Sequence, residues 1–262
     1  MKIHGVLCAL TPVVLTVAAG MCTDGAAYAA AKQTSAEAAI KAAAAKHRYV
    51  VVTFYKKSDA ASDWALEAVR SSKAKLSARA DFATADVGSQ ANQALLKRYG
   101  LNAATVPITL VIAPNGAVTG GISGRAEPDK VKAAFVSDGM ANVLKVLQSG
   151  KIVLVCVQNG KTKLSKESLK AATAFKADSR LPGAVDIVKI DPSNRAEAKF
   201  LGLCKVDPKG PNAQIVMIAP SGMIVGRFPG QTTKDTMYAS LQTALKSSSG
   251  CGPGASPGCC PR

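Results

Sequence analysis

The chain contains the apolar run Val50-Val51-Val52-Thr53-Phe54-Tyr55, which is followed at once by Lys56-Lys57-Ser58-Asp59-Ala60-Ala61-Ser62. The first run is continuous and rich in β-branched residues, which is typical of a strand buried on both faces of a sheet. Ser58 and Asp59 both favour the N-cap of a helix, and we expect that helix to reach about Ala78. The two runs together predict a central strand that leads through a short loop into a helix.

Further helices and strands are expected on both sides of this unit. The pattern predicts helices over residues 34–47, 58–78, 89–100 and 128–147, and strands over residues 50–55, 82–87, 108–113 and 117–122. The last two strands form a hairpin, because Pro114-Asn115-Gly116 between them is a turn signal. In the helix after the loop, we expect one apolar side to include Trp64, Leu66 and Val69.

This order of elements resembles the thioredoxin superfamily over roughly residues 33–148. The resemblance implies an α/β fold with a central mixed sheet flanked by helices. Redox members of that superfamily carry Cys-x-x-Cys after the strand, where this chain has Asp59 and Ser62, and they tend to carry a carboxylate where this chain has Thr53. Because disulfide exchange needs a thiolate and a second thiol, we expect no thioredoxin-type catalysis, no catalytic residue and no cofactor.

The resemblance also implies an edge that binds polypeptide. Val106-Pro107 stands where the superfamily has a cis-proline facing the active-site loop, and where the residue before the proline pairs its main chain with a bound peptide. The alternative is a purely structural role, in which the bond only shapes the turn into the next strand. The candidate peptide-binding residues are Ser58, Asp59, Ser62, Thr105, Val106 and Pro107.

The same pattern returns 106 residues further along the chain. In this second copy Ala213 occupies the place of Pro107, and the loop over residues 205–211 is longer. We therefore expect a degenerate thioredoxin-like domain that is more structural than functional. The repeat is visible where Ile112-Ala113-Pro114-Asn115-Gly116 becomes Ile218-Ala219-Pro220-Ser221-Gly222, and where Gly120 and Gly124 become Gly226 and Gly230.

The two ends of the chain have other compositions. Lys2, the apolar run from Val6 to Ala19 and Ala27-Tyr28-Ala29 are typical of a cleaved secretory signal, with a membrane anchor or lipid attachment at Cys22 as alternatives. After cleavage we expect no membrane span and a periplasmic or secreted protein. The expected parts are a signal peptide over residues 1–29, thioredoxin-like domains over residues 30–148 and 149–247, and a flexible Cys/Gly/Pro tail over residues 248–262.

Five cysteines follow the expected signal. Cys156 lies in an apolar run and is expected in the core, whereas Cys204 is expected near the surface, and a disulfide between the two is left open. His47 is the only histidine after the signal, so no zinc site or histidine-based catalysis is expected. The candidates for thiol chemistry, soft-metal binding or cross-linking are the tail residues Cys251, Cys259 and Cys260.

The chain is strongly basic, with a formal net charge of +16. Residues 30–148 hold 16 Lys+Arg and 9 Asp+Glu, and residues 149–248 hold 15 and 7. Charge spread this evenly, without interleaved aromatics, does not indicate a specific nucleic-acid site, but it favours adhesion to an anionic polymer.

The sequence therefore predicts an exported, redox-inactive protein that binds a polypeptide or another envelope component, or that acts as a scaffold. The alternative is a thiol-disulfide oxidoreductase or soft-metal-binding protein that uses the tail cysteines. A third expectation is a disulfide-linked oligomer, cross-linked through the tail.

Overall fold

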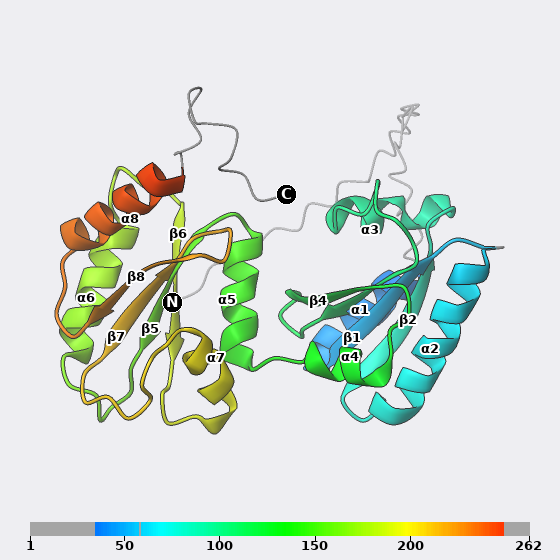
Figure 1. Ribbon diagram of the computed structural model, residues 1–262, viewed down its shortest axis with the longest axis horizontal. Helices are drawn as coiled ribbons and strands as arrows, with labels where there is room; N and C mark the ends of the chain where they lie inside the picture. Colours follow the sequence, from blue (N-terminus) through cyan, green and yellow to red (C-terminus); the bar gives the residue numbers. More distant parts are fainter. Residues whose placement is uncertain (1–34, 58, 249–262) are drawn as a thin grey trace, which may run out of the picture. The chain divides into compact units, whose positions relative to one another are not determined.

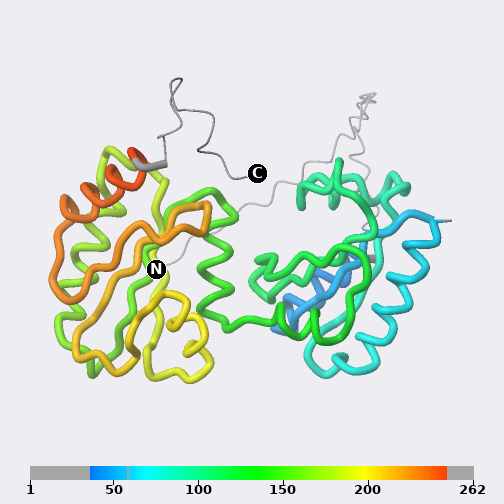
Figure 2. Tube along the Cα trace, viewed as in Figure 1, coloured from blue at the N-terminus to red at the C-terminus, as the bar shows by residue number. Residues whose placement is uncertain are grey.

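The computed structural model describes residues 35–57 and 59–248. These residues form two four-stranded sheets, each covered by helices (Figure 1). The trace in Figure 2 shows the two halves of the described chain following one another, the first coloured from blue to green and the second from green to red. Among the described residues, no helix has the length and apolar character needed to cross a membrane. The expected signal peptide, Ser58 and the tail from residue 249 lie outside the described residues.

The first sheet has the strand order β2-β1-β3-β4. β1 is parallel to β2 and antiparallel to β3, and β3 is antiparallel to β4. Residues 50–54 of β1 are all buried, as the apolar run predicts for a central strand. The strands are β1 (Tyr49–Tyr55), β2 (Ala80–Asp86), β3 (Ile108–Ile112) and β4 (Val118–Ser123).

Four helices cover the two faces of this sheet. Because successive residues of a strand point to opposite faces, Val52 packs with α1 and α3, whereas Val51 packs with α2 and α4. The helices are α1 (Ser35–Ala45), α2 (Ala60–Leu76), α3 (Gln93–Arg98), which follows the short 3-10 helix η1 (Gln90–Asn92), and α4 (Pro128–Ala133).

The second sheet repeats this topology in the order β6-β5-β7-β8. Val155 of the central strand packs with α5 and α7, and Leu154 packs with α6 and α8. The strands are β5 (Ile152–Val157), β6 (Val185–Ile190), β7 (Gln214–Ile218) and β8 (Ile224–Pro229). The helices are α5 (Asp138–Gln148), α6 (Ser165–Lys176), η2 (Arg195–Glu197), α7 (Ala198–Leu203) and α8 (Lys234–Ser248).

The repeat extends to irregular features of the backbone. The β3–β4 register shifts between Val111 and Ile112, and the β7–β8 register shifts at the matching place, between Met217 and Ile218. The hairpin turns carry Gly116 and Gly222 at φ angles of 81° and 84°, a conformation that glycine adopts without steric cost. The expected pair of tandem thioredoxin-like folds is confirmed by these two sheets.

The prediction of a single helix over residues 128–147 is wrong. Helix α4 ends at Ala133, and α5 starts again after Ser137, whose hydroxyl accepts a hydrogen bond from the Met140 N–H at 3.3 Å. Val143 of α5 is buried in the core of the second sheet, although it precedes the predicted domain boundary at residue 148. That boundary stays a prediction.

The apolar side expected for α2 is also wrong at Trp64, which is 67% exposed. The buried side of the helix consists of Ser62, Ala65, Ala68, Val69 and Ser72, which recur every three or four residues and so lie on one helix face. Trp64 lies outside this stripe and faces solvent.

Candidate functional site

Asp59 and Ser62, the two residues at the expected cysteine places, form a hydrogen bond at the start of α2. The Ser62 hydroxyl donates to Asp59 Oδ2 at 2.9 Å and accepts from the Lys56 N–H at 3.1 Å. Asp59 is the N-cap residue as expected, but its carboxylate makes no bond to the helix main chain. Ser62 is only 1% exposed, so its hydroxyl is used inside the fold. The third candidate of this loop, Ser58, is not among the described residues.

Thr53 lies in β1 and pairs with Thr109 of β3. Their hydroxyl oxygens are 2.9 Å apart, and both residues are fully buried. The place where the superfamily tends to have a carboxylate therefore holds a satisfied, neutral hydroxyl pair.

The expected binding edge, residues 105–107, lies at the same end of the sheet as the loop that follows β1. Phe54 near the end of β1 pairs with Ile108 at the start of β3. The loop after β1 and residues 105–107 therefore both adjoin this pair. Thr105 is exposed, Val106 is half-buried and Pro107 is buried, and the Val106–Pro107 peptide bond is cis. Whether these residues bind a peptide stays a prediction.

The main chain of this edge has free hydrogen-bonding groups. Within the described residues, the N–H and C=O groups of Thr105 and Val106 make no hydrogen bond, while the Pro107 C=O accepts from the Gly124 N–H at 2.9 Å. Unpaired main-chain groups of this kind are available to an added strand.

In the second domain the matching segment is bonded to Lys163. Residues 211–213 match residues 105–107, and the Gly230 N–H donates to the Ala213 C=O as Gly124 donates to Pro107. Here, however, the Lys163 N–H donates to the Pro211 C=O and the Ala213 N–H donates to the Lys163 C=O, both at 2.9 Å. Sequence reasoning missed this contact, and the only signal for it was Ala213, which supplies an N–H that proline lacks.

The two cysteines of the described residues are both free and buried. Cys156 faces the core with α6 and α8, whereas Cys204 lies in the core with α5 and α7, on the other face of the sheet, so the two do not form a disulfide. Burial raises the pKa of the Cys156 thiol to about 11 and also raises that of Cys204. The expected surface position of Cys204 is wrong, because the residue is 2% exposed.

The tail candidates Cys251, Cys259 and Cys260 lie outside the described residues. In the part of the chain that the structure describes, no three His, Cys, Asp or Glu side chains gather as metal ligands.

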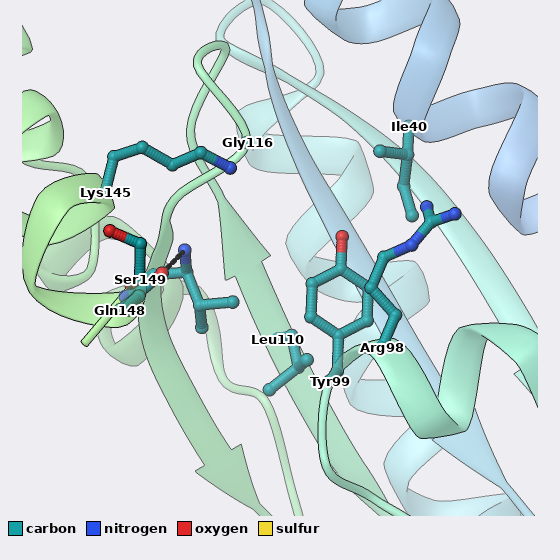
Figure 3. Close-up of a pocket in the computed structure, with 9 residues that line it drawn as sticks. Ile40, Arg98, Tyr99, Leu110, Gly116, Lys145, Gln148 and Ser149 are labelled. Atoms are coloured by element: carbon teal, nitrogen blue, oxygen red, sulfur yellow. Dashed lines mark hydrogen bonds between the residues drawn. The ribbon is translucent and has the colours of Figure 1, made fainter. Parts of the chain in front are cut away.

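A hollow of about 600 Å³ lies elsewhere, and none of the predicted site residues lines it (Figure 3). Arg98 at its wall is paired with Glu37 at 3.1 Å, and the Gln148 side chain exchanges two hydrogen bonds with the main chain of Val118. In Figure 3 the side chains of Lys145 and Tyr99 lie on opposite sides of the hollow. Sequence reasoning did not find it, because its residues come from separate elements.

No protein-family model matches the chain, and no curated protein matches it. Solved structures similar to it include the germline-specific thioredoxin Deadhead from Drosophila melanogaster, with 21% identity over 38% of this chain and 90% of that one, at a TM-score of 0.31. A disulphide isomerase from Xylella fastidiosa has 16% identity over 45% of this chain and 94% of its own, at 0.30. The oxidised C-terminal domain of DsbD from Neisseria meningitidis has 25% identity over 36% and 84%, at 0.28.

The fold itself follows from the strand order and pairing, which are the same in both sheets and agree with the order that the resemblance implies. Both domains of this chain have the thioredoxin-like fold.

Proposed function

We propose that this protein is an exported, redox-inactive thioredoxin-like protein that binds an extended polypeptide at residues 105–107 of its first domain. The observation that carries the proposal is the set of free main-chain groups at Thr105 and Val106. In the second domain the Pro211 C=O, which matches the Thr105 C=O, is already bonded to the Lys163 N–H.

Binding at this edge uses strand addition. An extended segment pairs its own N–H and C=O groups with those of Thr105 and Val106, and Pro107 contributes no donor. Because main-chain groups are common to all sequences, this mode fits a protein that holds polypeptides or acts as a scaffold for them. The adjacent Lys56 and Lys57 are exposed and favour acidic segments.

The chemistry of the loop supports a role without redox turnover. Asp59 and Ser62 carry no thiol, and no two cysteines of the sequence stand three residues apart. The thiols of Cys156 and Cys204 are buried, and their raised pKa values keep them protonated near neutral pH. A thiol-disulfide or soft-metal function would therefore depend on the tail cysteines.

An exported location, periplasmic or secreted, is proposed from the signal-like residues 1–29. The partner proposed there is a polypeptide or another envelope component, and the net charge of +16 favours anionic polymers as additional ligands. The tail cysteines would link protomers in such a compartment, because disulfides persist there.

Site-specific photocross-linking tests the binding edge. A benzophenone amino acid is placed at exposed position 105, and the matched control carries it at exposed position 211 of the second domain. The probe is reduced, carboxymethylated α-lactalbumin, an acidic chain that stays unfolded, at about 0.3 M salt so that long-range charge effects are screened. We expect cross-linking from position 105 and little from position 211. Equal yields from both positions, or none from position 105, would contradict the proposal.

A substitution supplies a second test of the same edge. Thr105→Pro removes the N–H of residue 105, and the second domain already accepts proline at the matching position, Pro211. We expect weaker binding of the probe. An insulin-reduction assay with dithiothreitol, on the wild type and on a chain with Cys251, Cys259 and Cys260 replaced by Ser, tests the alternative, because activity in the wild type alone would make the tail the reactive centre.

A further inference from the structure

Residues 159–164 of the second domain cross the edge that matches the proposed binding edge of the first. We name this segment the strap. Its residue Lys163 forms a parallel bridge with Asn212, donating its N–H to the Pro211 C=O and accepting from the Ala213 N–H, both at 2.9 Å. One residue that makes two main-chain bonds to the segment leading into β7 is the smallest form of strand addition.

The sequence of the second domain is adapted to this contact. Ala213 stands where the first domain has Pro107, and only a residue with an N–H can donate to Lys163. The C=O of Ala213 keeps the same partner as in the first domain, the N–H of the glycine after the hairpin. The edge thus keeps its place in the fold, and the exchange of proline for alanine adds the donor that the strap uses.

The strap is held by a turn of its own. Asn159 Oδ1 accepts from the N–H groups of Lys161 and Thr162 at 2.9 and 3.2 Å, and Thr162 Oγ1 accepts from the Asn159 N–H at 2.7 Å. Thr162 and Ser165, which stand where the first domain has Asp59 and Ser62, share a hydrogen bond of 3.0 Å. The loop that would carry the cysteines of a redox domain is here shaped to reach the edge.

The strap also contains a conformational strain. Leu164 has a φ angle of 58°, in the left-handed region that a branched side chain adopts only at a cost. The side chains of Lys161, Lys163 and Leu164 are exposed, and Asn159 Nδ2 joins the strap to Asp191 Oδ1 at 2.9 Å. Two main-chain bonds to residues 211–213 and this side-chain bond attach the strap to the rest of the domain, and one of its residues is strained, which suits the segment to being displaced.

We propose that the strap is a built-in ligand that closes a latent second site for extended polypeptide, at residues 211–213. An incoming segment competes with Lys163 for the Pro211 C=O and the Ala213 N–H, and the site opens when the strap leaves. The nature of the ligand rests on the function proposed above, whereas closure by the strap rests only on its own contacts.

The test uses the full chain and two substitutions at one residue. Lys163→Pro removes the N–H that bonds to Pro211 and leaves residues 211–213 unchanged, whereas the control Lys163→Ala removes only the side chain. Asn159→Ala, which removes both bonds to Asn159 Oδ1, serves as a second opening variant if Lys163→Pro does not fold.

Amide hydrogen exchange of the protein without any ligand measures whether the strap covers residues 211–213. We expect the Ala213 amide to exchange at least about tenfold faster in Lys163→Pro than in the wild type, with Lys163→Ala unchanged. The same exchange rate in all three proteins would overturn closure by the strap, whatever the protein binds.

Cross-linking to reduced, carboxymethylated α-lactalbumin measures the latent site. We expect position 211 to cross-link in Lys163→Pro and not in Lys163→Ala, with the yield from position 105 unaltered. Faster exchange without cross-linking at position 211, while position 105 still cross-links, overturns the latent site. Loss of cross-linking at both positions in every protein contradicts the proposed function instead, and the exchange result then stands by itself.

Discussion

Thr53 and Cys156 occupy the same place in the two sheets. Thr53 pairs with Thr109 and Cys156 pairs with Ile215, and these partners stand 106 residues apart, as the repeat requires. Both side chains are fully buried. One domain has a hydroxyl pair there and the other has a protonated thiol, so neither has an ionised group near neutral pH at this place.

The hydroxyl pair predicts non-additive effects on stability. Thr53→Val leaves the Thr109 hydroxyl buried without a partner, and we expect a loss of about 1–3 kcal/mol in the free energy of unfolding. Replacing both residues by Val removes both polar groups at nearly constant volume, so the double variant is expected to be more stable than the sum of the single changes. Urea unfolding of the four proteins measures the coupling, and purely additive losses would contradict it.

Burial of the two thiols predicts that they do not react in the folded protein. In a chain with Cys8, Cys22, Cys251, Cys259 and Cys260 replaced by Ser, we expect Ellman's reagent at about pH 8 to label neither Cys156 nor Cys204 until denaturant is added. Both thiols then react. Rapid labelling of either thiol in the native chain would show that it is accessible and would contradict this prediction.

The fold could be predicted from the sequence because the strongest sequence patterns were local. The run over residues 50–55 is apolar and β-branched throughout, and the repeated turn at Gly116 and Gly222 needs a backbone conformation that favours glycine, so strand and hairpin could be read directly. The buried face of α2 could not be read in this way. It is made of small residues such as Ala65, Ala68 and Ser72, which a search for large apolar side chains overlooks in favour of Trp64.

The parts of the site that sequence reasoning missed depend on long-range contacts. Nothing near Lys163 in the sequence indicates that its main chain pairs with residues 211–213. Cys204 was placed near the surface because a loop was expected there, whereas it caps the short helix α7 and is buried against the sheet. In both cases the partner lies in another element, and no local propensity describes it.

Close packing at the start of α5 predicts that adding one methyl group at Gly139 destabilises the protein. A Cβ at Gly139 would meet Ile190 Cδ1 and lie 2.6 Å from Glu197 Oε2, the carboxylate that binds the Gly139 N–H and the Ser137 hydroxyl. We expect Gly139→Ala to lower the free energy of unfolding by about 1–3 kcal/mol.

Gly202→Ala in α7 is the control for that substitution, because nothing lies within 4 Å of its Cβ. It is expected to raise the free energy of unfolding by about 0.5–1 kcal/mol, since alanine favours the helix. Urea unfolding compares the two variants, and a stable Gly139→Ala protein would mean that the contact with Glu197 does not hold α5.

Asp178 connects the end of α6 to the start of α8. Its carboxylate, 3% exposed, accepts from Arg180 Nε and Nη2 at 2.8 and 2.7 Å, and Lys234 Nζ lies 3.4 Å away. The Arg180 guanidinium also lies 3.7 Å from the centroid of the Tyr238 ring. Hydrogen bonds from Arg180 hold the pKa of Asp178 well below its usual range.

A lowered pKa in the folded state fixes how stability depends on pH. The contribution of Asp178 is present above the pKa of an unfolded aspartate, about 3.9, and is lost as the pH falls from there toward the folded pKa. We therefore expect Asp178→Asn to lower the Tm by roughly 3 °C or more at pH 7, and the gap to the wild type to narrow between about pH 5 and pH 3. Asp235→Asn is the control, because Asp235 is 76% exposed, bonds only weakly to Arg180 at 3.2 Å and is expected to change the Tm little. Calorimetry across this range measures both variants, and a gap for Asp178→Asn as large at pH 3 as at pH 7 would show that packing, and not the charge on Asp178, joins the two helices.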